Sequence, residues 1–208
     1  MSQAYRRSSA WSQAAFNKDP ENLLWWRAVR KRMDLESLRD SVLVATNQLD
    51  PTIGGASIRM MDAPFSNRRT LYAYIDRQNL PGVFRSFDFA SPDTHVPIRL
   101  STTVPQQGLF MMNSPMIDQL AVAMSTKLLE QTKGTEAKDA EQVQALQTDL
   151  LKKMFQSILL RQPTDTQMDR CRAYLLQGQA NQEANPASIA WQDLAKSLLC
   201  TNEFCFID

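Results

Sequence analysis

Residues 143–175, VQALQTDLLKKMFQSILLRQPTDTQMDRCRAYL, decide the fold class of this chain. Apolar residues recur there at steps of three and four, the spacing of one face of an α-helix; they are Val143, Leu146, Leu150, Met154 and Ile158. Pro163 stops this stripe. Thr164 and Gln167 then have the capping-box spacing, in which each side chain satisfies the backbone N–H of the other residue. A second helical stripe follows at Met168, Cys171 and Leu175.

Helical signals continue on both sides of this stretch. Ser114-Pro115 opens a segment with an apolar face at Ile117, Leu120, Met124 and Leu128. Asn185-Pro186 is a cap and first-turn pair, and it leads to Trp191, Leu194 and Leu198. The chain finishes on Phe204, Phe206 and Ile207, an apolar tail that we expect to cover the 191–198 helix against the segment beginning at Val143.

The polar residues 131–141 are interpreted as a solvent-exposed linker. We therefore expect a single domain over residues 1–208, with a possible subdivision into 1–130 and 140–208. Further toward the N-terminus, Asp19-Pro20 has the form of another helix start. Apolar residues at helical steps follow as far as Leu49, and Asp50-Pro51 with Gly54-Gly55 ends them. These signals predict one long helix between Pro20 and Leu49.

Residues 51–104 are the irregular part of the chain, with five of its ten prolines and weak periodicity. Residues 68–77, RRTLYAYIDR, fit either a helix or a short strand, and we favour a helix. A connection of this length usually means a packed or functional loop. The predicted fold is mainly α, a helical bundle-like domain with a long, irregular, proline-containing middle segment.

Composition excludes several classes of function. Lys and Arg total 23 against 22 acidic residues, so the net charge is +1, which is not the concentrated basic face of a nucleic-acid-binding protein. Residues 1–60 hold 9 basic and 6 acidic groups, an imbalance that we interpret as one face of a soluble body. No apolar run is long enough to span a bilayer, so membrane insertion is not expected. Three cysteines without framework spacing argue against a disulfide scaffold, and pairing of Cys200 with Cys205 stays open.

No motif for catalysis, metal or cofactor binding is found. His95 is the single histidine, which rules out a multi-histidine metal site and a CxxCH haem attachment, so neither metal nor cofactor is expected. Gly54-Gly55 lacks the lysine of a phosphate-binding loop and is interpreted as a tight turn. Trp25-Trp26 is interpreted as a core residue beside a boundary residue.

The polar residues of the middle segment are the best candidates for a site. Arg forks pair bidentately with carboxylates, so these residues could clamp the long loops to the helices. Alternatively, they could line a cleft for an anionic or sugar ligand. The candidate ligand-binding residues are Arg68, Arg69, Tyr72, Asp88, Asp93 and Arg99.

Several blocks of sequence together resemble a planctomycete-specific domain family of unknown function. The first block is Asp19-Pro20-Glu21-Asn22-Leu23-Leu24-Trp25-Trp26-Arg27, and later ones include Gly54-Gly55-Ala56-Ser57, Arg68-Arg69-Thr70-Leu71-Tyr72 and Asn202-Glu203-Phe204. The resemblance implies a C-terminal domain of a large exported or periplasmic protein, in which it follows another planctomycete-specific domain. Some members also carry a cytochrome-c-like domain, whose haem-binding parts this chain lacks.

The sequence favours a non-catalytic binding or structural module whose partners are neighbouring domains of the parent protein. A carbohydrate or anionic ligand is a further possibility. The alternative is a hydrolytic or carbohydrate-active enzyme domain with a cleft in the middle segment near Asp88, Asp93 and Arg99. No pair of carboxylates with a catalytic signature supports that alternative, and no catalytic residue is assigned.

Overall fold

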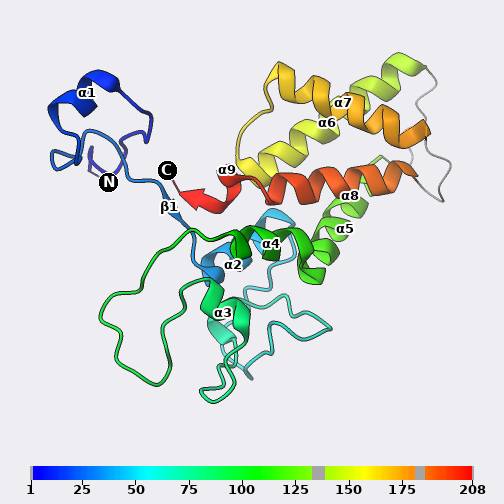
Figure 1. The fold of residues 1–208 in the computed structure, drawn as a ribbon. Helices are drawn as coiled ribbons and strands as arrows, with labels where there is room; N and C mark the ends of the chain where they lie inside the picture. The colour runs from blue at the N-terminus through cyan, green and yellow to red at the C-terminus, as the bar shows by residue number, and fades with distance from the viewer. Residues whose placement is uncertain (1, 133–138, 181–185, 208) are drawn as a thin grey trace.

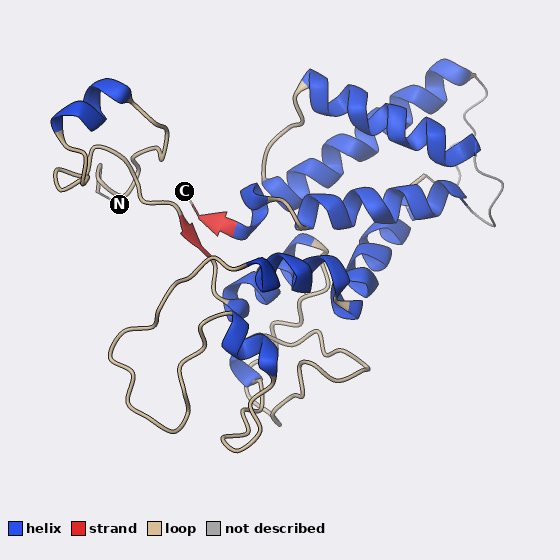
Figure 2. Cartoon of the chain, viewed as in Figure 1, coloured by secondary structure: helices blue, strands red, loops and turns tan. Residues whose placement is uncertain are grey.

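The computed structural model describes residues 2–132, 139–180 and 186–207, and it is mainly α-helical (Figures 1 and 2). Within these ranges the chain forms nine α-helices, a short 3₁₀-helix and one sheet of two strands. The predicted fold class is confirmed.

Four long helices form the C-terminal half, and they follow the predicted signals. They are α5 (Pro115–Glu130), α6 (Ala140–Leu159), α7 (Asp165–Ala180) and α8 (Pro186–Leu199). Helix α8 packs against α5, α6 and α7, so it is the central element of this half (Figure 1). The apolar stripes meet in one core, which includes Leu120, Met124, Leu151, Met154, Leu175, Trp191 and Leu199.

The predicted capping box at the start of α7 is present. The backbone N–H of Thr164 donates to Gln167 Oε1 at 3.0 Å, and the N–H of Gln167 donates to Thr164 Oγ1 at 3.3 Å. Residues 133–138 of the predicted linker lie outside the described residues, as does Asn185 of the predicted cap.

The long helix predicted between Pro20 and Leu49 is wrong. The helix here is α2 (Leu35–Ala45), which is capped by the Asp34 carboxylate accepting from the N–H of Ser37 at 2.7 Å. The Asp19 carboxylate instead accepts hydrogen bonds from the N–H groups of Leu23 and Leu24, and it therefore closes a turn. A short helix, α1 (Gln13–Lys18), precedes this turn and ends at Asp19.

The middle segment is irregular, as predicted. It contains the 3₁₀-helix η1 (Thr70–Tyr72) and the short helix α3 (Gly82–Ser86), and α4 (Pro105–Asn113) follows it. The helix favoured for 68–77 is thus reduced to η1. Around it the chain is partly strand-like, because Ile58 N–H donates to Tyr72 O and Tyr74 N–H donates to Ile58 O, both at 2.8 Å. These bonds to a distant segment replace those of a longer helix.

The C-terminal tail docks on the helical body through Phe204, which is buried. This residue belongs to α9 (Asn202–Cys205), and α9 contacts α6 and α8 as expected. The next two residues form β2 (Phe206–Ile207), which pairs antiparallel with β1 (Lys31–Arg32). Ile207 is exposed, so the tail covers the body less completely than predicted. Cys171, Cys200 and Cys205 are all free thiols, and Cys200 therefore does not pair with Cys205.

Candidate functional site

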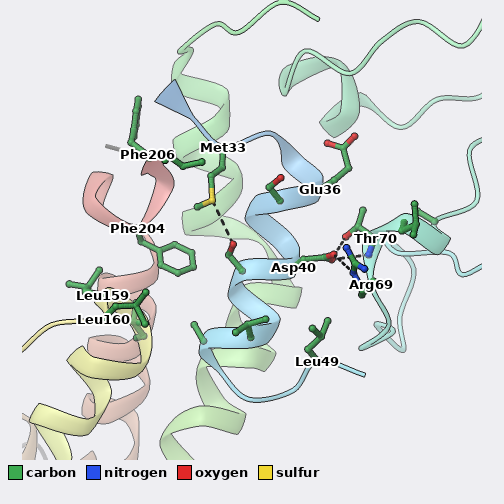
Figure 3. Close-up of a pocket in the computed structure, with 18 of the residues that line it drawn as sticks. Met33, Glu36, Asp40, Leu49, Arg69, Thr70, Leu159, Leu160, Phe204 and Phe206 are labelled. Atoms are coloured by element: carbon green, nitrogen blue, oxygen red, sulfur yellow. Dashed lines mark hydrogen bonds and ion pairs between the residues drawn. The ribbon is translucent and has the colours of Figure 1, made fainter. Parts of the chain in front are cut away.

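A groove with a volume of about 970 Å³ lies along α2 and is the candidate site. Figure 3 shows its arrangement: Leu159, Leu160, Phe204 and Phe206 lie on one side of α2, and Arg69 and Thr70 lie on the other. Helix α2 thus forms the floor, the ends of α6 and α9 form one wall, and the segment around η1 forms the other. Most of the lining side chains are apolar.

The η1 wall is fixed to α2 by a pair of adjacent charged residues. The Arg39 guanidinium is buried and donates from Nη1 to Arg68 O at 2.9 Å and to Thr70 Oγ1 at 3.1 Å. It also donates from Nη2 to Ser66 O. Asp40 accepts from the N–H of Thr70 at 2.8 Å and from its hydroxyl at 2.7 Å. Burial lowers the pKa of Arg39, and the charge of Asp40 opposes this shift, so the guanidinium stays protonated.

The opposite wall is fixed by an ion pair between the turn after α6 and the start of α9. Arg161 donates to both carboxylate oxygens of Glu203, with a distance of 2.7 Å from Nη2 to Oε2. This hydrogen bonding to Glu203 raises the pKa of Arg161. Arg161 also donates to Gln167 Oε1 at 3.0 Å, so one side chain joins α7, α9 and the turn between α6 and α7. The wall is therefore held by contacts within the chain.

Three of the aliphatic side chains that line the groove come from separate elements and are more than 60% exposed. They are Val44 of α2, Leu71 of η1 and Leu160 at the end of α6, with exposed fractions between 61% and 79%. Exposed leucine or valine is ordinary when it is isolated, but apolar residues that converge on one concavity mark a binding surface.

Leu160 is also in an unusual backbone conformation. It ends α6 with φ 56° and ψ 23°, the left-handed region in which Gly is the usual residue after a helix and which costs other residues energy. Leu160 is the most exposed of the three groove aliphatics, so burial does not offset that cost.

The six residues predicted from sequence do not form one cluster. Arg69 lines the groove and lies 3.6 Å from Asp40. Arg68 and Tyr72 hold the Gly54-Gly55 turn: Arg68 donates to Ala56 O at 2.6 Å and stacks on the Tyr72 ring, whose hydroxyl accepts from the N–H of Gly54. Both glycines have positive φ, which confirms the predicted turn.

Like Arg68 and Tyr72, the other three predicted residues do not line the groove. Asp88 accepts from the N–H and the hydroxyl of Thr102, at 2.6 and 2.9 Å, and Arg99 donates to Asp88 O at 2.7 Å. Arg99 also forms an ion pair with Glu36 of α2 at 2.8 Å. Asp88 and Arg99 line a second, smaller pocket of about 130 Å³. Asp93 pairs with Arg77 at 3.4 Å on the surface. These contacts clamp the loops of the middle segment to α2 and to each other.

Sequence reasoning missed the residues that shape the groove. The local sequence around Arg39 gives no sign that it is buried, although it is among the largest fully buried side chains of the described residues. Val44 falls outside the apolar stripe of α2, and Leu160 follows directly on two apolar residues at the end of α6. The sequence held one signal of the groove: a leucine at the position where the helix must end, directly before Arg161-Gln162-Pro163.

Within residues 2–132, 139–180 and 186–207, no group of three or more His, Cys, Asp or Glu residues could hold a metal ion. The helices described there include none that is both long and apolar enough to cross a membrane.

Comparison with known proteins places the chain in a family but does not supply an activity. No curated protein and no solved structure matches it. The model of one family, PSD1, described as a protein of unknown function (DUF1553), matches residues 1–175, which is most of the chain. The chain therefore belongs to the PSD1 family of proteins of unknown function (DUF1553).

Proposed function

We propose that this chain is a non-catalytic protein-binding module whose groove along α2 binds an apolar segment of another polypeptide. The observation that carries the proposal is the convergence of Val44, Leu71 and Leu160 on one preformed concavity while all three stay exposed. Burying a large aliphatic side chain contributes about 1.5–3 kcal/mol, so covering these three supplies substantial binding energy.

The lining favours a polypeptide over the carbohydrate or anionic ligand that the sequence also suggested. The acidic lining residues Glu36 and Asp40 are engaged by Arg99 and Thr70, and Arg69 lies beside Asp40. Sugars and anions need polar groups that point into the site, whereas this groove presents mainly aliphatic surface. The pairing of Asp88 with Thr102 and of Asp93 with Arg77 likewise favours a binding role over the hydrolytic alternative.

The charged side chains that line the groove are paired with each other or with neighbouring arginines. Three acidic side chains and one basic side chain line the groove: Glu36, Asp40, Glu203 and Arg69. Glu36 pairs with Arg99, Asp40 with Arg69 and Glu203 with Arg161, so the walls give the bound segment no preferred sign of charge. The location of such a partner in a neighbouring domain of a larger, exported, planctomycete-type protein rests on the motif resemblance and is part of the proposal.

A displayed library of random short peptides, selected on the purified chain, tests this function. We expect enriched peptides to share a pattern of apolar residues, and Leu160→Asp or Val44→Asp to abolish their binding. The matched control is Leu176→Asp on α7, because Leu176 is 62% exposed and does not line the groove. Enrichment that survives Leu160→Asp and Val44→Asp, or selection that yields no binder, would overturn the proposal.

A further inference from the structure

A second apolar surface lies on the N-terminal arm, which we define as residues 2–32. Figure 1 shows that this arm extends away from the helical body and joins it at β1. Its interior consists of a few aromatic contacts: Trp11 lies 4.6 Å from Phe16 and 5.8 Å from Trp26 between ring centroids. The Arg27 guanidinium lies over both tryptophan rings, at 4.9 and 5.1 Å.

Polar contacts inside the arm form a defined loop at residues 19–25. The Asp19 carboxylate is buried and accepts from the N–H groups of Leu23 and Leu24, at 2.9 and 2.7 Å. The Asn22 side chain bonds the backbone of Arg27 in both directions, at 3.0 and 3.2 Å. The indole N–H of Trp26 donates to Asp19 O at 2.8 Å. The loop is therefore a specific structure with satisfied polar groups.

This loop holds three consecutive large apolar side chains in solvent. The exposed fractions of Leu23, Leu24 and Trp25 are between 66% and 77%. Trp25 is therefore not the core residue predicted at the tryptophan pair. Trp25 also has φ 57°, a conformation that is strained for a bulky residue. Strain together with exposure is unfavourable in the free chain, and it is explained if Trp25 is buried against a partner.

The charge of the arm indicates the kind of partner. Residues 2–32 contain seven basic residues and two acidic ones, and one of the two, Asp19, is buried. Five of the seven basic residues are arginines. Trp, Tyr and Arg are the residue types enriched in the energetic centres of protein–protein interfaces, where Lys is depleted. A membrane surface attracts Lys and Arg alike, so this composition favours a protein partner over a lipid one.

We infer that the N-terminal arm is a protein-docking surface, in which Leu23, Leu24 and Trp25 insert into an apolar face bordered by carboxylates. This surface is distinct from the groove. The arm fits an acidic apolar partner, whereas the groove selects an apolar segment without a preferred sign of charge.

The test uses the full chain and two synthetic amphipathic helical peptides with the same Leu and Phe face. One peptide carries Glu on its polar face and the other carries Lys. Both peptides are measured on the Leu160→Asp variant, which under the proposed function no longer binds apolar segments in its groove. We expect saturable binding of the Glu peptide, followed by fluorescence anisotropy, and no comparable binding of the Lys peptide. Trp25→Gly should weaken binding of the Glu peptide by about tenfold or more, since it removes a large buried anchor.

Trp25→Gly is an informative variant because it separates folding from docking. Gly adopts positive φ without strain, and the Trp25 carbonyl, which accepts from Arg7 at 2.7 Å, is retained. The variant should therefore unfold at the wild-type temperature or above it. The Leu160→Asp background keeps binding in the groove out of this comparison, because Leu160 belongs to the groove.

Three results would overturn the inference. The first is equal binding of the Glu and Lys peptides, and the second is binding of the Glu peptide that Trp25→Gly does not change. The third is binding to vesicles of phosphatidylcholine and phosphatidylglycerol without binding to either peptide, which would assign the arm to a membrane surface.

Discussion

Among single changes of charged residues in the middle of this fold, Arg39→Met should cause the largest loss of stability. The Met side chain fills much of the space of the arginine but donates no hydrogen bond. Two backbone acceptors, Ser66 O and Arg68 O, then lose their donor, whereas the Thr70 hydroxyl keeps its bond to Asp40. An orphaned acceptor costs about 1–2 kcal/mol where some water can reach it, so the expected loss is about 2–4 kcal/mol.

The matched control is Arg69→Met, which removes the neighbouring arginine predicted from sequence. Arg69 is 54% exposed and makes one ion pair with Asp40 at 3.6 Å. Exposed pairs contribute about 0–1 kcal/mol, so this change should be nearly silent. Urea unfolding followed by far-UV circular dichroism gives both free energies of unfolding. If Arg39→Met lies within about 1 kcal/mol of the wild type, or if Arg69→Met is the more harmful change, the assignment of Arg39 as the clamp is wrong.

Three further predictions follow from single positions. Leu160→Gly should raise the free energy of unfolding by about 0.5–1 kcal/mol in urea, because Gly relieves the left-handed backbone; a loss of stability would contradict this reasoning. In thermal melts Phe204→Ala should cost about 3–5 kcal/mol and Ile207→Ala less than about 1 kcal/mol, since only the first side chain is buried; equal effects would refute the docking of the tail through α9. Burial raises the pKa of the Cys205 thiol from an ordinary value of 9.0 to about 11, so the folded state holds this proton more tightly. The stability that the protonated thiol contributes is complete below about pH 9 and is lost as the pH rises through 11. The free energy of unfolding should fall less steeply over that range in Cys205→Ala, and parallel slopes would exclude the effect.

The helices that could be predicted are those with a local start signal and a continuous apolar stripe. At α7, the box between Thr164 and Gln167 lies within four residues of sequence, so neighbouring residues determine it. The stripe of α6 determines its buried face in the same way, because residues three and four apart share a face of any helix. These helices could be predicted because the residues that interact are also close together in the sequence.

The helix predicted from Asp19-Pro20 failed for the opposite reason. Asp19 has the residue type of a helix cap, but its carboxylate bonds two N–H groups four and five residues ahead and closes a loop. Asn22 and Trp25 then take positive φ, which ends any helical run. Local sequence preference does not predict positive φ at Trp25, whose carbonyl accepts a hydrogen bond from Arg7, eighteen residues away.

The candidate site was only partly accessible from sequence, because its geometry depends on long-range contacts. Arginines and carboxylates in the middle segment do clamp loops, as one of the two alternatives anticipated, through pairs such as Arg99 and Glu36. Their partners are nevertheless far apart in sequence, and Arg39 reaches residues 27 to 31 positions away. No periodicity records such a pairing, so the buried arginine could not be distinguished from a solvated one.

Leu160 brings the stability and the proposed function of the groove together at one residue. A chain selected for stability alone would favour Gly there, since α6 must end in the left-handed region before the turn to α7. The leucine that is present is strained and exposed, and both properties are unfavourable in the free protein. A gain in stability for Leu160→Gly, together with a loss of peptide binding for Leu160→Asp, would mean that the side chain is retained for what it contacts outside the chain. Natural proteins give up stability in this way at functional positions, and such a trade would account for Leu160 in the groove as it would for Trp25 in the N-terminal arm.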